Sequence, residues 1–254
     1  MHTNIRKMGL IFVSKCAILL CMTTPQLELC AASIEAVELA KKHHFDRIEL
    51  CQNLEQGGLT PSAGLIQMAL NFSVETHVLI RPRAGGFHYL PLELELIEKE
   101  IDFCARVGVK GVVVGLLKEN FDIDKEILHQ LMQRAPELDW TFHRAFDESI
   151  DWKRSLNVLI ELGFKRVLTS GFASNVEIGL PVLNQMCAYA NGRIQIMAGG
   201  GVNAGNISKL AQIEGLSAIH FSATQKELLD EDSAFSETIL KVSETRLQRI
   251  LAAL

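Results

Sequence analysis

Two short segments with the same pattern decide the fold: LELC at residues 27–30 and IELC at residues 48–51. In each, apolar residues alternate with Glu and Cys, as in an extended strand whose successive side chains point to opposite faces. In a parallel sheet covered by helices the apolar side packs under the helices, so we expect the Glu and Cys side chains to face inward together. A buried carboxylate costs several kcal/mol unless it is paired, so these acids need partners from other strands.

From Gln26 onward, strand-like runs alternate with helix-like runs, which is the pattern of a parallel sheet built from βα units. Eight such units predict an α/β protein, a single-domain (β/α)8 TIM barrel. An open doubly wound sheet is the alternative, weakened because no Gly-x-Gly-x-x-Gly follows the first strand. The predicted strands cover residues 26–30, 47–51, 76–81, 111–115, 139–143, 166–170, 194–198 and 217–222. The predicted helices begin at Ser33, at Thr60-Pro61 with Thr60 as N-cap, and near Pro91, Asp124, residue 151, Asn175 and Asn203, and the last covers 234–252.

Length and charge narrow the function. A chain of 254 residues with 48% hydrophobic residues can bury the core of one barrel. A net charge of −5 argues against nucleic-acid or anionic-membrane surfaces, which leaves metal ions or small anionic ligands as the expected partners. The 6 cysteines are too sparse for a disulfide scaffold and indicate a reducing, cytoplasmic compartment.

Residues 1–21 differ from the rest, and we assign the barrel to 22–254. Arg6 and Lys7 precede an apolar stretch, as in a secretory signal, but Lys15 divides that stretch and no small-x-small cleavage site follows. The segment is too short and too charged for a membrane span. We expect translation to begin at Met22, or residues 1–21 to form an N-terminal tail.

The barrel prediction places the functional site at the carboxyl ends of the strands. Polar residues fall there on the first, second, third and fifth strands, and together they suit acid/base chemistry with an arginine clamp for an oxyanion. A structural alternative is that the acids only form ion pairs with Arg81 or Arg144, and that His143 is a satisfied core histidine. The catalytic candidates are Glu28, Glu49, His143, Arg81 and Arg144.

Glycines and hydroxyl residues at the last three strand ends predict an anion site. Barrels commonly present backbone N–H groups to a phosphate after strands 7 and 8. Three glycines in a row also suit a simple tight turn. The candidate anion-binding residues are Ser170, Gly171, Gly199, Gly200, Gly201 and Ser222.

Cys30 and Cys51 fall on neighbouring strands about 4.8 Å apart. At matched heights the two sulfurs can span one Cu(I), a soft ion that accepts few ligands, or form a disulfide if their Cβ vectors converge. Each can equally be a small buried hydrophobe. Hard carboxylates are poor Cu(I) ligands, so a copper site leaves Glu28 and Glu49 without a role.

From about Leu27 to Thr224 the chain resembles the CutC family of copper homeostasis proteins. The resemblance implies a cytosolic (β/α)8 barrel, a homo-oligomer (a dimer or larger), and Cu(I) binding by the pair matching Cys30 and Cys51. One departure is Gly86, which stands where the family commonly has an acid in RPRGGDF. The matching motifs are DRIELC (46–51), EQGGLTPS (55–62), IRPR (80–83), TFHRAFD (141–147), RVLTSG (166–171), MAGGGV (197–202) and HFSA (220–223).

Three hypotheses therefore stand. The first is a CutC-type protein that binds Cu(I) through its Cys pair. The second is an enzyme acting on a small anionic, phosphorylated substrate, with acid/base groups at the mouth and its phosphate at the glycine turn. The third is an oligomeric scaffold with a vestigial mouth.

Overall fold

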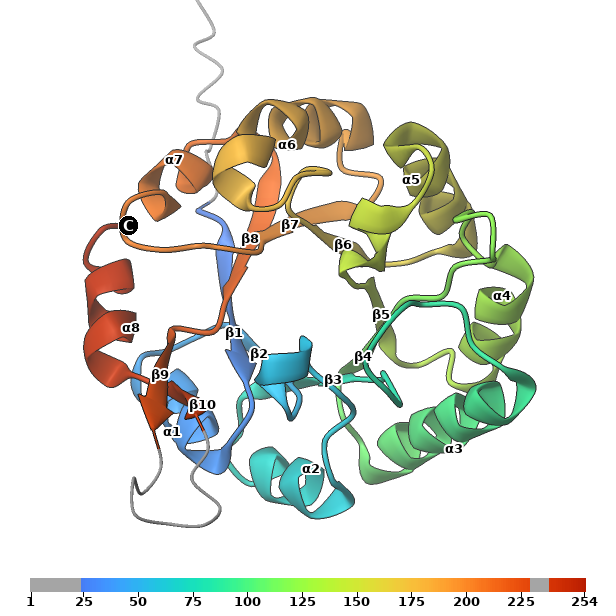
Figure 1. The fold of residues 1–254 in the computed structure, drawn as a ribbon, viewed down its shortest axis with the longest axis horizontal. Coiled ribbons are helices and arrows are strands. Elements are labelled where there is room, and N and C mark those ends of the chain that lie inside the picture. The colour runs from blue at the N-terminus through green and yellow to red at the C-terminus, as the bar shows by residue number, and fades with distance from the viewer. Residues whose placement is uncertain (1–23, 229–237) are drawn as a thin grey trace, which may run out of the picture.

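Eight parallel strands form a closed barrel in the computed structural model of the protein, which describes residues 24–228 and 238–254 (Figure 1). Each strand pairs with the next along the chain, and the eighth pairs with the first, so this sheet has no open edge. The predicted single-domain (β/α)8 barrel is confirmed, and the open doubly wound alternative is wrong. The strands are β1 (Gln26–Ala31), β2 (Arg47–Leu50), β3 (Glu75–Leu79), β4 (Gly111–Val114), β5 (Asp139–Phe142), β6 (Arg166–Thr169), β7 (Gln195–Gly199) and β8 (Leu216–Phe221).

Helices surround the barrel in the order that the βα pattern requires (Figure 1). Ser33, Asp124 and Asn175 are N-caps, as the sequence predicts, and each side chain accepts a backbone N–H of the first turn. The helices are α1 (Ile34–Lys42), α2 (Ala63–Leu70), α3 (Pro91–Val107), α4 (Lys125–Arg134), α5 (Trp152–Leu162), α6 (Val176–Ala190), α7 (Ile207–Ala211) and α8 (Glu244–Leu251), with 3₁₀ turns η1 (Leu54–Gln56) and η2 (Arg144–Glu148).

The alternation in β1 and β2 has the expected result. Leu29, Ile48 and Leu50 are fully buried in the main apolar core, which lies between the strands and the helices. Glu28 and Glu49 take the opposite phase, and they too are buried, inside the barrel. The barrel interior is therefore partly polar, and the closed ring of strands brings these polar side chains close together.

The start of α2 differs from the prediction. Ser62, not Thr60, is its N-cap. The Thr60 hydroxyl instead donates to Glu100 Oε2 at 2.9 Å and accepts the backbone N–H of Arg81 at 2.8 Å. The Thr-Pro pair fits the capping pattern, but tertiary hydrogen bonds to the end of β3 and to α3 use the hydroxyl.

The predicted helix near Asn203 begins one turn later, because α7 starts at Ile207 with Asn206 as its N-cap. Residues 203–206 form a turn in which the Asn203 N–H donates to Asn206 Oδ1 at 2.8 Å. The Asn203 side chain accepts the N–H of Gly205 at 2.8 Å. Asn residues favour such local turns over a helical first turn.

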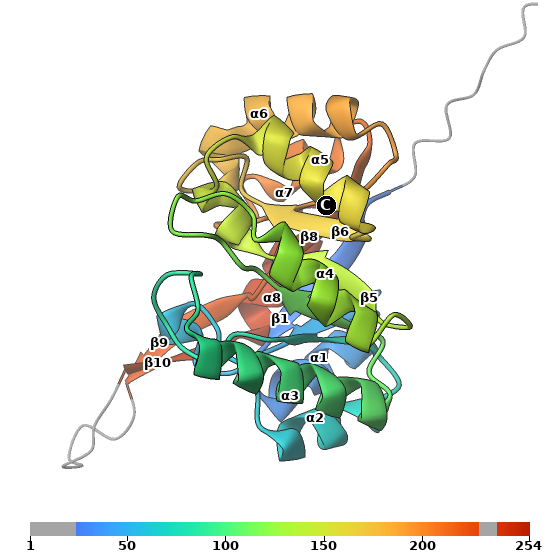
Figure 2. The same ribbon diagram turned by 90° about the vertical axis from the view of Figure 1, so that its right-hand side faces the viewer.

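The predicted helix over 234–252 is wrong in its first part. An antiparallel hairpin of β9 (Thr224–Leu228) and β10 (Thr238–Val242) precedes α8, and residues 234–237 lie outside the described residues. The hairpin projects from the end of the barrel at which β8 ends (Figure 2). Thr, Ile and Val in β10 favour a strand, and Ser243 then caps α8. The predicted extension at 1–21 also lies outside the described residues.

A close approach of α6 to the end of β6 gives a stability prediction. A Cβ on Gly179 would lie 1.8 Å from the carbonyl oxygen of Ser170, so that either the helix or the strand must shift. We expect Gly179→Ala to lower the free energy of unfolding by about 1–3 kcal/mol in urea, although Ala is the better helix former. Gly64→Ala in α2, where no atom lies within 4 Å, is the control and should be neutral or stabilising. Equal stability of the two variants would contradict this packing.

Candidate functional site

Glu28 is fully buried inside the barrel, with 1% of its surface exposed, and both of its carboxylate oxygens are engaged. Arg47 Nε donates to Oε2, and His220 Nδ1 lies 2.7 Å from Oε1. Burial alone would raise the carboxyl pKa, but the hydrogen bond with His220 and the charge of Arg47 hold this pKa well below its ordinary value. Glu28 therefore stays ionised and fixes the position of His220.

The partners predicted for the two acids are wrong. Among the described residues, neither Glu28 nor Glu49 forms an ion pair with Arg81 or Arg144; Arg47, on β2 itself, is the arginine of Glu28. Arg81 is unavailable because its two Nη atoms donate to loop carbonyls, which is how it fastens the β2–α2 loop to the β3–α3 loop. The acceptors are the carbonyl oxygens of Gln56 at 2.9 Å, Gly58 at 3.0 Å and Gly85 at 2.9 Å.

Glu49 and His220 form the acid–imidazole pair of the mouth, with His220 Nε2 3.3 Å from Glu49 Oε2. Burial raises the pKa of Glu49 to about 6, although the charge of His220 opposes this shift. Burial alone would lower the pKa of His220, but the charge of Glu49 and hydrogen bonds to Cys30 and Glu28 raise it well above its ordinary value. His220 is thus an imidazolium between two carboxyl groups, and Glu49 can gain or lose a proton near neutrality.

Cys30 and Cys51 are buried free thiols whose Sγ atoms lie 3.6 Å apart. Cys30 and Cys51 are not directly opposite each other, since the β1–β2 register places Cys30 opposite Glu49. Strands in a closed barrel are staggered, and the two side chains lean together across that offset. The hydrogen bond with Cys51, together with burial, raises the pKa of Cys30 well above its ordinary value. Cys30, Glu49 and His220 also form one group of possible metal ligands, whose ligand atoms lie within 4.8 Å of one another.

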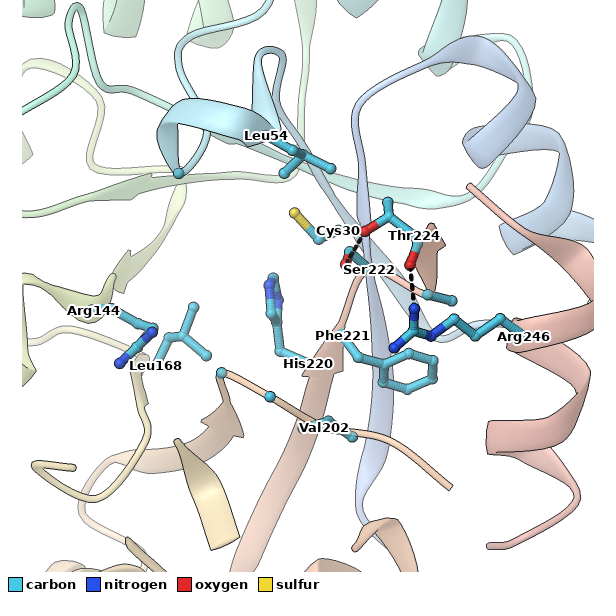
Figure 3. A pocket seen from close by; sticks show the side chains of 14 residues that line it. Cys30, Leu54, Arg144, Leu168, Val202, His220, Phe221, Ser222, Thr224 and Arg246 are labelled. Atoms are coloured by element: carbon cyan, nitrogen blue, oxygen red, sulfur yellow. Dashed lines mark hydrogen bonds between the residues drawn. The ribbon is translucent and has the colours of Figure 1, made fainter. Parts of the chain in front are cut away.

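Two adjoining cavities open at this end of the barrel, and Cys30, Arg144 and His220 line both of them. We call the first the inner cavity, of about 130 Å³, and the second the outer cavity, of about 310 Å³. Figure 3 shows the outer cavity, with His220 and Cys30 beside each other and Arg144 and Arg246 on opposite sides. The inner cavity is lined by Cys30, Glu49, Cys51, Gly57, Gly58, Leu79, Arg81, Phe87, His143, Arg144, Leu168 and His220.

The glycine turn after β7, residues 200–202, lines the outer cavity, as does Ser222. In the described part of the chain, the backbone N–H groups of Gly200, Gly201 and Val202 have no hydrogen-bond acceptor. Arg144 lies against this turn, because a Cβ on Gly200 would be 3.0 Å from Arg144 Nη1. Three free amides beside a guanidinium form a surface suited to an anion.

Three residues expected at the anion site lie elsewhere. Ser170 is fully buried, and its Oγ accepts from Arg144 Nη2 at 2.8 Å, while Arg144 Nε donates to Asp147 Oδ2 at 2.9 Å. Gly171 packs against α6, and neither it, Ser170 nor Gly199 lines the two cavities. Ser170 therefore positions Arg144 rather than a ligand, because the end of β6 is used for packing against α6.

His143 lines the inner cavity and is 5% exposed. Its Nδ1 accepts the backbone N–H of Ala145 at 3.1 Å. Burial and the charge of Arg81 lower the pKa of His143 to about 3. The ring is therefore neutral at physiological pH, which does not suit the acid/base role predicted for it.

A second polar group, not predicted from the sequence, lies on the interior faces of the strands. Arg166 Nη1 contacts His77 Nδ1 at 3.2 Å and donates to Thr141 Oγ1 at 3.1 Å, and His77 Nε2 lies 3.2 Å from Glu75 Oε1. The sequence does contain a signal for polar residues inside the barrel. Arg47, for example, lies two residues before Glu49 on β2, so its side chain points to the same inward face. These residues come early in their strands, away from the mouth, so we regard them as a structural network.

The protonated state of His220 predicts a pH dependence of stability. An unfolded chain releases the His220 proton near about pH 6.5, whereas the folded protein retains it, so its stabilising contribution is lost as pH rises toward the folded pKa. Between about pH 6.5 and 8.5 the free energy of unfolding should fall, with a slope of at most about 1.4 kcal/mol per pH unit from this group. His220→Gln should remove that slope, and His129→Gln on the exposed face of α4 should keep it. Identical profiles for the wild type and His220→Gln in urea denaturation would contradict the assignment.

The fold and the site define a (β/α)8 barrel protein with a thiol, carboxyl and imidazole cluster at the carboxyl end of its strands. The sequence model of the CutC family matches residues 25–225, and the chain belongs to this family.

Known relatives are similar over most of this region. A family protein CutC from Bacteroides thetaiotaomicron is 42% identical over 202 residues, which cover 79% of this chain and 81% of the relative. The copper homeostasis protein cutC homolog of Homo sapiens is 40% identical over 198 residues, covering 78% of this chain and 72% of the relative. A CutC structure from Streptococcus agalactiae, 35% identical, superposes with a TM-score of 0.73 and covers 77% of this chain and 97% of that one.

Among the described residues, no helix combines the length and apolar character that crossing a bilayer requires.

Proposed function

We propose that this CutC-family barrel binds Cu(I) at its carboxyl-end mouth through the thiolates of Cys30 and Cys51. The observation that carries the proposal is the pair of reduced, buried sulfurs 3.6 Å apart at the wall of the inner cavity. Soft thiolates favour Cu(I) over hard cations, whereas a structural zinc site wants four ligands. The name of the human relative supports copper as the ligand.

The neighbouring charges favour the two-sulfur site over one built from Cys30, Glu49 and His220. His220 is held as an imidazolium by Glu28 and Glu49, and a protonated ring has no lone pair for a metal. The raised pKa of Cys30 means that Cu(I) must displace a thiol proton, so apparent affinity rises with pH.

Titration of the reduced protein with Cu(I), in competition with a chromophoric Cu(I) chelator, tests this proposal. We expect one tightly held Cu(I) per chain, with protons released on binding, and little competition from Zn²⁺. Copper that remains on the chelator, or several weak sites instead of one, would contradict it.

We also propose that the protein is cytoplasmic and forms a homo-oligomer. The reduced thiol pair suits a reducing cytoplasm. Exposed Leu90, Leu92 and Leu96 at the start of α3 support a homo-oligomer, because exposed apolar groups of this kind mark contact surfaces. Sedimentation analysis of the wild type and Leu92→Glu tests the assembly, and an unchanged mass for the variant would argue against this surface.

A second candidate function is an enzyme acting on a small phosphorylated substrate. The three free amides of the glycine turn next to Arg144 favour it, since a carrier of copper needs no anion seat. Glu49, within the adjoining inner cavity, is placed to move a proton, and its carboxyl group can do so near neutral pH.

Binding of inorganic phosphate tests the anion seat of this second candidate. We expect calorimetry to show binding to the wild type, with a loss of about 10-fold or more in Arg144→Gln because a charge-assisted contact is removed. Arg154→Gln, which changes an exposed arginine of α5, is the matched control and should bind like the wild type. Equal binding by all three proteins would argue against the seat.

A further inference from the structure

A buried ring N–H at the wall of the inner cavity has no acceptor. His143 Nε2 is enclosed and lacks a hydrogen-bond partner in residues 24–228 and 238–254. The backbone N–H of Ala145 donates to Nδ1, so in the neutral ring Nδ1 carries the lone pair and Nε2 carries the proton. His143 therefore presents a fixed hydrogen-bond donor.

The surroundings determine where that donor points. The Cε1–Nδ1 edge of the ring lies against Gly115, where a Cβ would come within 2.2 Å of Cε1 and 2.4 Å of Nδ1. Phe87 packs on the ring with its centroid 4.9 Å away. The Nε2–Cδ2 edge lies away from Gly115, and Nε2 is buried within the wall of the inner cavity that His143 lines, so a small shift of that wall brings it to a ligand oxygen.

The ring is kept neutral and in place by its neighbours. Arg81, whose positive charge disfavours a protonated His143 ring, is held in place by hydrogen bonds to three loop carbonyls. Among the described residues, its own Nε also lacks a hydrogen-bond partner. A buried donor without a partner costs stability, and natural proteins satisfy such groups with an ordered water, an ion or a ligand.

A ligand that satisfies this donor brings an acceptor oxygen to the inner cavity. A carbonyl oxygen suits this position better than a carboxylate, because Glu49 lines the same cavity and would repel a second anion when ionised. The inner cavity adjoins the outer one at Cys30, Arg144 and His220, so one small molecule can reach from His143 to the glycine turn.

We propose that His143 Nε2–H donates to the carbonyl oxygen of a small phosphorylated aldehyde or ketone, whose phosphate lies at the turn formed by residues 200–202. The inference rests on the second candidate function and adds its substrate class. A neutral imidazole donor polarises the C=O bond without protonating it, which prepares the adjacent carbon for proton transfer.

Dihydroxyacetone phosphate is the probe, and glycerol 3-phosphate, of similar size and charge but without the carbonyl, is its control. His143→Asn keeps an acceptor for the Ala145 amide and loses the donor at the Nε2 position, whereas His143→Gln can restore a donor there. Infrared spectra should show the bound C=O stretch at lower frequency in the wild type and His143→Gln, and not in His143→Asn. His143→Asn should bind the ketone about five- to tenfold more weakly and glycerol 3-phosphate as the wild type does.

Two results would overturn the inference. If both probes bind equally well and the C=O frequency is the same in the wild type and His143→Asn, His143 does not contact a carbonyl, while the phosphate seat still stands. If neither probe nor inorganic phosphate binds the wild type, the second candidate function itself fails, and the inference fails with it. The wild-type spectrum alone decides between a polarised and an unpolarised carbonyl should His143→Asn not fold.

Discussion

Replacing Cys51 by Ser is expected to abolish tight Cu(I) binding. The hydroxyl that remains is a hard, weakly acidic ligand, and it leaves Cys30 as the single thiolate at the proposed site. Losing a direct ligand should cost more than the roughly 10–100-fold in affinity that the loss of an outer-shell partner costs. Competition with a chromophoric chelator measures the change, and Cys30→Ser should have the same effect.

Cys104→Ser provides the control for this experiment. Cys104 is a buried free thiol on α3 and lines neither cavity of the mouth. The variant should keep the wild-type stoichiometry and affinity, although the small loss of packing can lower its stability. If Cys51→Ser and Cys104→Ser bind Cu(I) alike, the metal is not held by the thiol pair.

The variant Arg47→Met is expected to lose about 3–5 kcal/mol of folding free energy, because it removes one partner of a buried ion pair. Arg47 and Glu28 are both about 1% exposed, and among the described residues the remaining carboxylate would keep only His220 as an ion-pair partner. Urea denaturation at neutral pH measures the loss. Since the pKa of Glu28 is held well below its ordinary value, this acid still contributes at mildly acidic pH, and the difference should persist there.

Arg249→Met is the matched control for Arg47→Met, since Arg249 is exposed on α8. Its effect should stay within about 0.5 kcal/mol, as is usual for surface substitutions. In a double-mutant cycle, Arg47→Met combined with Glu28→Gln should lose less than the sum of the single changes, by about 0.5–3 kcal/mol. Full additivity would mean that the two side chains do not stabilise each other.

The fold was predictable because its signals are local and repeated. Alternation in LELC and IELC assigns two strands and their inward faces, and the caps at Ser33, Asp124 and Asn175 mark helix starts. The end of the chain was not predictable in the same way. A 3.6-residue pattern can be found over 234–252, but pairing with β9 makes Thr238–Val242 a strand.

Which residues gather at the mouth could be read from strand phase, but their contacts could not. Arg81 follows the end of the expected strand, yet loop carbonyls that are distant in sequence hold its guanidinium. Likewise, Ser170 accepts a hydrogen bond from Arg144 instead of lining the cavity, because α6 packs closely on the end of β6. Such choices depend on loop geometry and barrel stagger, neither of which a single sequence specifies.

The neutral state of His143 shows the same limit. Its position at the end of β5 suggests acid/base chemistry, but burial and the charge of Arg81 lower the pKa of the ring to about 3 and keep it neutral. Conversely, Arg47 was overlooked although it shares the strand phase of Glu49. An interior arginine next to two interior acids is a signal that sequence analysis can use in other barrels.

An anomalous difference map at the copper edge, from crystals of the reduced protein loaded with one equivalent of Cu(I), tests the central claim most directly. We expect a single strong peak between the Sγ atoms of Cys30 and Cys51. A peak at surface histidines, or density for an intact unmetallated thiol pair with copper bound elsewhere, would contradict it.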